Sequence, residues 1–168
     1  MPVIQLTSVQ DLLKFIEDHR SDIENGTYDV RIERDWVPRL SEDTCHFLIK
    51  YSPLARYMIG LAATSRGILK VLVGDDDKYV RQRVALNPNV LSDISEELSK
   101  DTEVSVRRAI AGNPNTSTGV LEILCRDTDS NVRMIVASNP NTPPGILEIL
   151  SKDRNADVCG AAVRNPNF

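Results

Sequence analysis

The stretch VRRAIAGNPNTSTGVLEILCRDTDSNVRMIVASNPNTPPGILEIL, residues 106–150, holds nearly two copies of one sequence unit. The tripeptide Asn-Pro-Asn occurs in it at 113–115 and 139–141, and outside it at 87–89 and 165–167, always 26 residues apart. A fixed period of this length is the sequence signature of a repeat architecture. The spacing predicts a chain built from stacked copies of one small unit.

Other positions recur with the same spacing. Val-Arg occurs at residues 80–81, 106–107 and 132–133, and a degenerate first copy has Leu61 where the later copies have Asn. The predicted repeat array covers residues 54–168, divided into 54–79, 80–105, 106–131, 132–157 and a half-repeat 158–168. Residues 1–53 lack the repeat and are interpreted as an N-terminal cap.

Within a unit, apolar residues such as Val132, Val136 and Ala137 recur with the spacing of one face of a short helix. The proline of Asn-Pro-Asn ends that helix. Thr142 is expected to cap a second helix with Pro143 at its first position. The predicted buried stripe of that helix consists of Ile146, Leu147, Ile149 and Leu150.

A helix pair of this size cannot bury its apolar face alone, so neighbouring units must stack into a solenoid. Stacking aligns Arg81, Arg107 and Arg133 in one row, and aspartates recur at Asp75, Asp101, Asp127 and Asp153. Two interpretations follow. The arginines either pair with these acids as a ladder between repeats, which we favour, or bind phosphates or an acidic partner.

The sequence of residues 106–150 resembles the leucine-rich repeat variant family, a relative of HEAT-like α-solenoids, and the resemblance extends over about residues 54–168. It implies a mainly all-α, right-handed superhelix in which an α-helix pairs with a shorter, often 3₁₀, helix. Some members of that family carry an iron-sulfur cluster on cysteines before the repeats. Only Cys45 lies in that region here, so the resemblance implies an interaction scaffold without a cluster.

The cap is predicted to contain a helix, a short strand and a second helix. Thr7 or Ser8 caps the first, whose apolar face comprises Val9, Leu12, Leu13, Ile16 and Ile23. The alternation around Val30 indicates a strand, which needs a partner, and Ser41 opens the second helix. Trp36 lies in a charged, turn-like stretch, so we expect it to be exposed. With Arg34, Asp35 and Tyr28 it forms the predicted partner-binding site, because Trp and Arg are typical of binding hot spots.

Composition narrows the class of protein. The net charge is −4, and residues 1–53 hold 6 Lys/Arg against 10 Asp/Glu, a balance that argues against nucleic acid as the partner. The start lacks a basic leader and no apolar run spans a bilayer. Three scattered cysteines fit reduced thiols in the cytoplasm. His19 and His46 have no ligand spacing for a metal or a catalytic pair, so we expect no metal, no cofactor and no enzyme activity.

The predicted function is a non-enzymatic protein-protein interaction module. One specific hypothesis is an inhibitor or immunity-type partner of a basic protein such as a nuclease toxin, bound by the acidic cap. The alternative is a solenoid that binds nucleic acid through Arg81, Arg107 and Arg133. The half-repeat carries Ala161, Ala162 and Val163 without a following helix, so a homodimer through this end is a further hypothesis.

Overall fold

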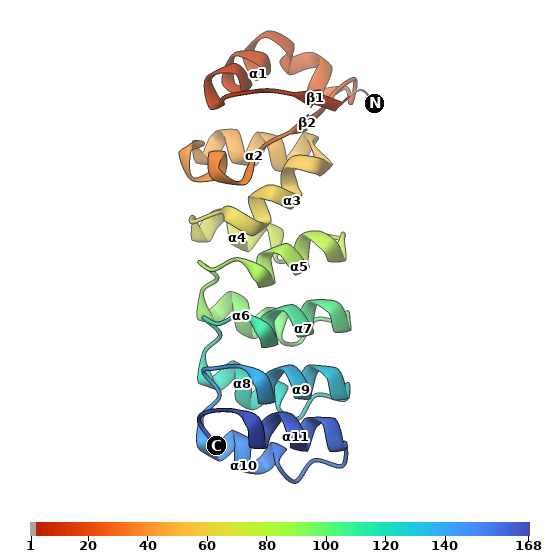
Figure 1. Cartoon of the computed structure of the whole chain (residues 1–168). Helices are drawn as coiled ribbons and strands as arrows, with labels where there is room; N and C mark the ends of the chain where they lie inside the picture. Colours follow the sequence, from red (N-terminus) through yellow and green to blue (C-terminus); the bar gives the residue numbers. More distant parts are fainter. Residues whose placement is uncertain (1–2) are drawn as a thin grey trace.

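The computed structural model describes residues 3–168, and this part of the chain is a single stack of short helices running from the N-terminal to the C-terminal end (Figure 1). The predicted all-α solenoid is confirmed. None of the described helices is both long enough and apolar enough to cross a membrane. The α-helices are α1 (Val9–Glu24), α2 (Glu42–Tyr51), α3 (Pro53–Ala62), α4 (Arg66–Leu72), α5 (Lys78–Leu86), α6 (Ser92–Leu98), α7 (Val104–Gly112), α8 (Thr118–Leu124), α9 (Ser130–Ser138), α10 (Pro144–Leu150) and α11 (Ala156–Arg164).

The first helix of each unit packs on the first helix of the next, in the order α3, α5, α7, α9 and α11. The valine that recurs every 26 residues, at 80, 106, 132 and 158, is buried at each of these contacts. The shorter helices α4, α6, α8 and α10 lie on the other side of the stack and contribute Leu72, Leu98, Leu124 and Leu150 to the same continuous core. Both helices of a unit are α-helical, and the 3₁₀ helix of the described residues is η1 (Arg34–Arg39) in the cap.

The first asparagine of each Asn-Pro-Asn turn is a buried link between units. Asn113 donates from Nδ2 to the backbone carbonyls of Ala85 (2.8 Å) and Asn87 (3.0 Å), and its Oδ1 accepts the N–H of Asn115 (2.9 Å). Asn139 and Asn165 make the corresponding bonds to the unit before them. The carbonyls at a helix C-terminus have no partner within the helix, and this side chain supplies one. The structural interpretation of these turns is confirmed.

The turn of the first unit is built differently, as Leu61 indicated. It has Ala63-Thr64-Ser65 in place of Asn-Pro-Asn. Ala55 and Ile59 of α3 are buried like Val80 and Val84 of α5, a spacing of 25 residues rather than 26. The helix α3 is therefore offset by one residue from the later first helices.

A buried serine is one of the links between the cap and the array. The predicted strand is β2 (Asp29–Arg31), and its partner is β1 (Val3–Gln5), paired in parallel with Ile4 opposite Val30. Ser52 is the N-cap of α3, and its hydroxyl oxygen accepts the N–H groups of Ala55 and Val30, both at 3.2 Å. This hydroxyl also lies 2.6 Å from a carboxylate oxygen of Asp29. One side chain thus fixes the strand to the first repeat helix.

Three local expectations were wrong. Thr142 is not a cap, because its hydroxyl donates to the carbonyl of Val136 and the helix α10 begins at Pro144 with Pro143 as N-cap. Ile149 is 49% exposed rather than buried, because its side chain lies on the outer surface of α10. Leu13 is also exposed rather than buried, because its side chain lies on the outer surface of α1. The caps expected at Ser8 and Ser41 are both present.

The neighbours Ile149 and Leu150 provide a matched test of this register. Leu150 is buried, so Leu150→Ala should lower the free energy of unfolding by about 2–5 kcal/mol through lost contacts and a cavity. Ile149→Ala should cost less than about 1 kcal/mol, because half of the side chain is already in water. Chemical denaturation of both variants measures the difference. Equal losses would show that the register of α10 is incorrect.

Candidate protein-binding surface

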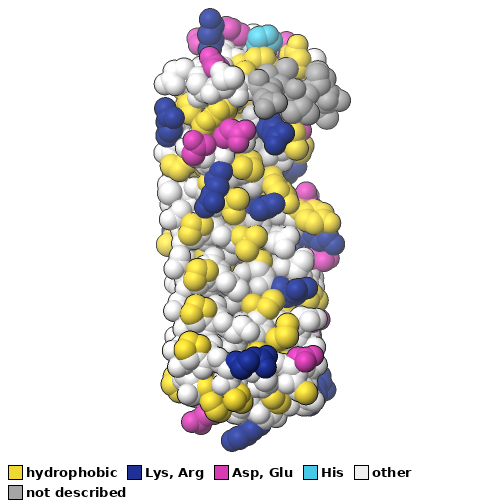
Figure 2. Space-filling model, viewed as in Figure 1, with side chains coloured by type: hydrophobic (Ala, Val, Ile, Leu, Met, Phe, Trp, Pro, Cys, Tyr) yellow, Lys and Arg dark blue, Asp and Glu magenta, His cyan; other side chains and the backbone are white. Residues whose placement is uncertain are grey.

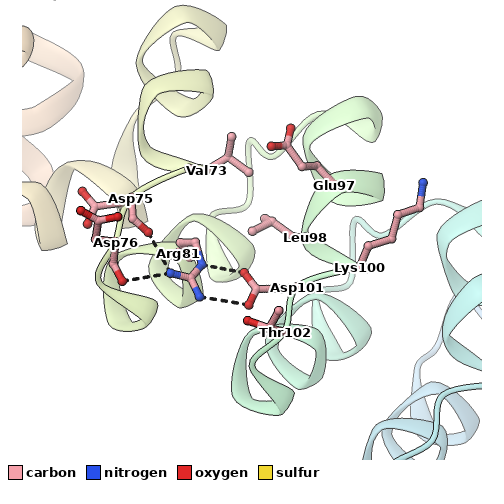
Figure 3. Close-up of a pocket in the computed structure, with 10 residues that line it drawn as sticks. Val73, Asp75, Asp76, Arg81, Glu97, Leu98, Lys100, Asp101 and Thr102 are labelled. Atoms are coloured by element: carbon pink, nitrogen blue, oxygen red, sulfur yellow. Dashed lines mark hydrogen bonds and ion pairs between the residues drawn. The ribbon is translucent and has the colours of Figure 1, made fainter.

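The arginine row forms a ladder of ion pairs along one edge of the stack. Arg81 donates from Nε and Nη2 to the carboxylate of Asp101, at 2.6 and 3.1 Å, and from Nη1 to the carbonyl of Asp75 at 2.8 Å (Figure 3). Each guanidinium therefore clamps the loop before its own helix to the loop before the next first helix. The corresponding pairs are Arg107 with Asp127 and Arg133 with Asp153.

A first rung of this ladder was missed in the sequence. Arg56 lies 3.1 Å from the carboxylate of Asp75, but its Nε is buried without a hydrogen-bond partner. The offset of α3 explains why this pair was missed, because Arg56 precedes Arg81 by 25 residues and so escapes a search at 26. This rung, in the first unit of the array, is the least well satisfied of the ladder.

The ladder neutralises the arginine row. The side chains of Arg81, Arg107 and Arg133 are only 15%, 13% and 6% exposed, and each is bound by both oxygens of one carboxylate. The predicted ladder between repeats is confirmed. A shallow hollow of about 430 Å³ opens beside Arg81, between Glu97 and Thr102, but the guanidinium that borders it is already paired (Figure 3). Little of this charge is left for a phosphate group.

The pKa values of the ladder aspartates Asp101, Asp127 and Asp153 are lowered. Burial raises the pKa of Asp101 and Asp127, but hydrogen bonds from the arginine and from a backbone N–H lower it further, so each pKa lies below its ordinary value. The bond from Arg133 is the main cause of the lowered pKa of Asp153. The ladder is thus charged under any physiological condition.

Only some residues of the predicted partner-binding site are exposed. Trp36 is 7% exposed, so the expectation that it is free was wrong: its ring belongs to the core under η1, which packs on α3. Arg34 and Asp35, the two residues before Trp36, are exposed and border a hollow of about 480 Å³. Tyr28 does not line that hollow and packs edge-on against Phe15 and His19.

The thiols and histidines show no arrangement for chemistry. Burial, with a smaller effect of Glu42, raises the pKa of the Cys45 thiol to about 11, which keeps it protonated and unreactive at neutral pH. His19 stacks on Phe15 with its ring centroid 4.3 Å away. Among residues 3–168, no three His, Cys, Asp or Glu side chains are grouped as a metal would require.

A second surface, which sequence reasoning missed, lies on the adjoining helices α3 and α5. Its centre is Arg83, whose guanidinium lies 4.3 Å from the ring centroid of Tyr57 and donates to the Tyr57 hydroxyl at 3.2 Å. Around it, Tyr79 is 53% exposed and Leu86 43% exposed. Figure 2 shows hydrophobic side chains on this part of the stack and also along the rest of the same face. We call the set the Tyr–Arg patch: Leu54, Tyr57, Met58, Leu61, Tyr79, Arg83 and Leu86.

A signal for this patch exists in the repeat itself. The positions of Tyr79 and Leu86 are equivalent to those of Asn131 and Ser138, 52 residues later, and these two residues are also exposed. The valine is kept at 80, 106, 132 and 158, whereas these outward positions vary: Leu86, for example, is followed by Gly112, Ser138 and Arg164. Exposed residues that depart from the repeat are therefore not explained by stacking.

Comparison with known proteins agrees with the geometry. A family model described as leucine rich repeat variant matches residues 131–155. The resemblance to this family is confirmed. The matched leucine-rich repeat variant segment contains α9, its Asn-Pro-Asn turn and α10, followed by Asp153 of the ladder. No curated protein and no solved structure matches the chain.

The lowered pKa values predict acid sensitivity. A carboxylate whose folded pKa is depressed stabilises the fold fully above its unfolded pKa of about 3.9, and loses that contribution as the pH falls through the folded value. Asp127→Asn should therefore lower stability by about 1–3 kcal/mol at pH 7 and flatten its loss below about pH 4. Urea denaturation over a pH series measures both effects, with Asp18→Asn on the exposed surface of α1 as control. An unchanged acid slope in Asp127→Asn would contradict a role of the ladder in stability.

Proposed function

We propose that this chain is a non-enzymatic protein-binding module whose main contact surface is the Tyr–Arg patch. The observation that supports this most is the combination of exposed Tyr79 and Leu86 with Arg83, held in place on the ring of Tyr57. Tyr and Arg are two of the residue types enriched in binding hot spots. The proposal takes residues 1–53 as the cap and residues 54–168 as the array that holds the patch.

The structural basis of this proposal is rigidity. The patch lies on two helices whose backbones approach closely, since a Cβ added at Gly60 would lie 3.4 Å from the Arg83 side chain and the Val80 carbonyl. Side chains on rigid helices lose little conformational entropy when a partner binds. The fixed guanidinium of Arg83 also offers donors to an acceptor on the partner, next to apolar area that the partner can bury.

A second candidate function rests on the acidic cap. The outer surface of α1 exposes Asp11, Glu17, Asp18, Asp22 and Glu24 against two basic residues, Lys14 and Arg20. A surface of one charge sign accelerates association with a partner of the opposite sign. This supports the hypothesis of an inhibitor or immunity-type partner of a basic protein such as a nuclease toxin. The nucleic-acid alternative is less well supported, because the arginine row is paired with aspartates.

A homodimer through the C-terminal end is also proposed. Phe168 does not fold back over α11: its side chain is 56% exposed, and Val163 on α11 is exposed as well. In multi-angle light scattering, the dimer predicts a mass that rises with concentration and returns to that of a monomer in Val163→Ser/Phe168→Ser. A monomeric mass at all concentrations for the unchanged chain would exclude this dimer.

The Tyr–Arg patch is tested by substitutions at equivalent positions of different units. Tyr79→Ser/Leu86→Glu should abolish capture of the partner from extracts of the source cells, because it removes apolar contact area and adds a charge. The control Asn131→Ser/Ser138→Glu, 52 residues further on, should retain capture. Both variants should melt like the unchanged chain, because all four positions are exposed. Capture that survives the first pair, or that is lost equally in both, would exclude the patch.

A further inference from the structure

The second asparagine of each later turn makes an exposed link to the unit before it. Asn115 donates from Nδ2 to the carbonyl of Pro88 at 2.7 Å, and Asn167 donates likewise to the carbonyl of Pro140 at 2.7 Å. Asn141 makes the same bond to the carbonyl of Pro114. In all three turns the acceptor is a proline carbonyl 27 residues earlier in the chain.

Asn89 holds the same position in the first Asn-Pro-Asn turn, but its side-chain amide has no hydrogen bond to any residue from 3 to 168. Its backbone N–H donates to the Oδ1 of Asn87 at 2.8 Å, so the turn itself is formed in the same way as the others. What differs is the preceding unit, which has Ala63-Thr64-Ser65 and no proline carbonyl at this point. The first link of this series is therefore open.

The open link faces a hollow of about 480 Å³. Ala62 and Thr64 line one side, Pro88 and Asn89 line another, and the third wall is formed by the start of η1 with the residue before it. The hollow thus lies beside the one turn between a first and a second helix that lacks Asn-Pro-Asn among units 54–79, 80–105, 106–131 and 132–157. It borders the Tyr–Arg patch along the chain, since Leu61 and Leu86 each lie within three residues of its lining.

The charges of the third wall are also unpaired. Glu33, Arg34 and Asp35 are exposed, and within the described chain none of them forms an ion pair with another side chain. Two carboxylates against one guanidinium give the wall a net negative charge. Pro38 from η1 and Pro88 from the first Asn-Pro-Asn turn add apolar ring surface to the lining of the hollow.

We propose that this hollow binds an extended, proline-containing segment of a partner protein that carries a Lys or Arg next to the proline. The proline carbonyl accepts the hydrogen bond from Asn89, which completes the link that the other three turns make internally. The basic side chain pairs with Glu33 and Asp35, and the rings of Pro38 and Pro88 contact the extended backbone. Extended proline segments suit such a site because they are already ordered before binding. The inference rests on the proposed protein-binding function but uses a surface separate from the Tyr–Arg patch.

The probe is a panel of acetylated pentapeptide amides, Ala-X-Pro-X-Ala, in which X is Arg, Lys, Leu or Glu. Binding is followed on the isotope-labelled full chain by NMR, which resolves the side-chain amide of each asparagine. Peptides with Arg or Lys should shift the Asn89 side-chain amide and bind more tightly than those with Glu. Asn89→Ala should weaken this binding about tenfold, the effect of one lost hydrogen bond, without changing the melting temperature.

The matched control is Asn141→Ala, at the equivalent position of a later turn. It should keep peptide binding and lower the melting temperature, because it removes a bond that the fold uses. The patch variant Tyr79→Ser should keep peptide binding as well, so failure of the patch and failure of the hollow are distinguishable. Unchanged peptide binding in Asn89→Ala, shifts confined to the Tyr–Arg patch, a preference for Glu peptides, or no binding by any peptide would each overturn the proposal.

Discussion

The rest of the structure depends on one requirement. The last backbone carbonyls of each short first helix need hydrogen-bond donors from outside the helix. These helices are nine residues long in the later units, too short to be stable alone, and their last carbonyls lie at a buried contact. An asparagine from the following unit satisfies them, and on the opposite edge an arginine clamps two successive loops. Every unit is therefore completed by its neighbour, and the stack is stable only as a continuous array.

This constraint also explains where the proposed binding surfaces lie. In the later units, the recurrent asparagines, arginines and aspartates are used by the stack, and their side chains are bonded within it. The polar and apolar side chains that the stack does not use lie where the repeat is imperfect. These places are α3, α5 and the turn after α3. There the ladder rung of Arg56 is incomplete, the amide of Asn89 is open, and large side chains replace small ones. Both proposed surfaces lie at this junction.

The sequence periodicity was sufficient to predict the features that recur in every stacked unit. The helix–turn–helix units, the Asn-Pro-Asn links and the pairing of Arg with Asp all follow from a spacing of 26 residues. Features that occur once were not accessible in this way. Trp36 was expected in water because its neighbours are charged, yet η1 turns its ring toward the core while Arg34 and Asp35 face outward. Ile149 was assigned to the buried stripe because apolarity alone does not separate an outer position from an inner one. The Tyr–Arg patch requires knowing which faces of α3 and α5 adjoin.

The central claim is that binding occurs at side chains outside the repeat framework, on the first units. A photoreactive phenylalanine analogue placed at residue 79, and separately at residue 131, tests it in living cells, because the two positions are equivalent in the stack and both exposed. The account predicts a crosslinked partner from position 79 and none above background from position 131. A partner captured from position 131 alone, or equally from both, would contradict it.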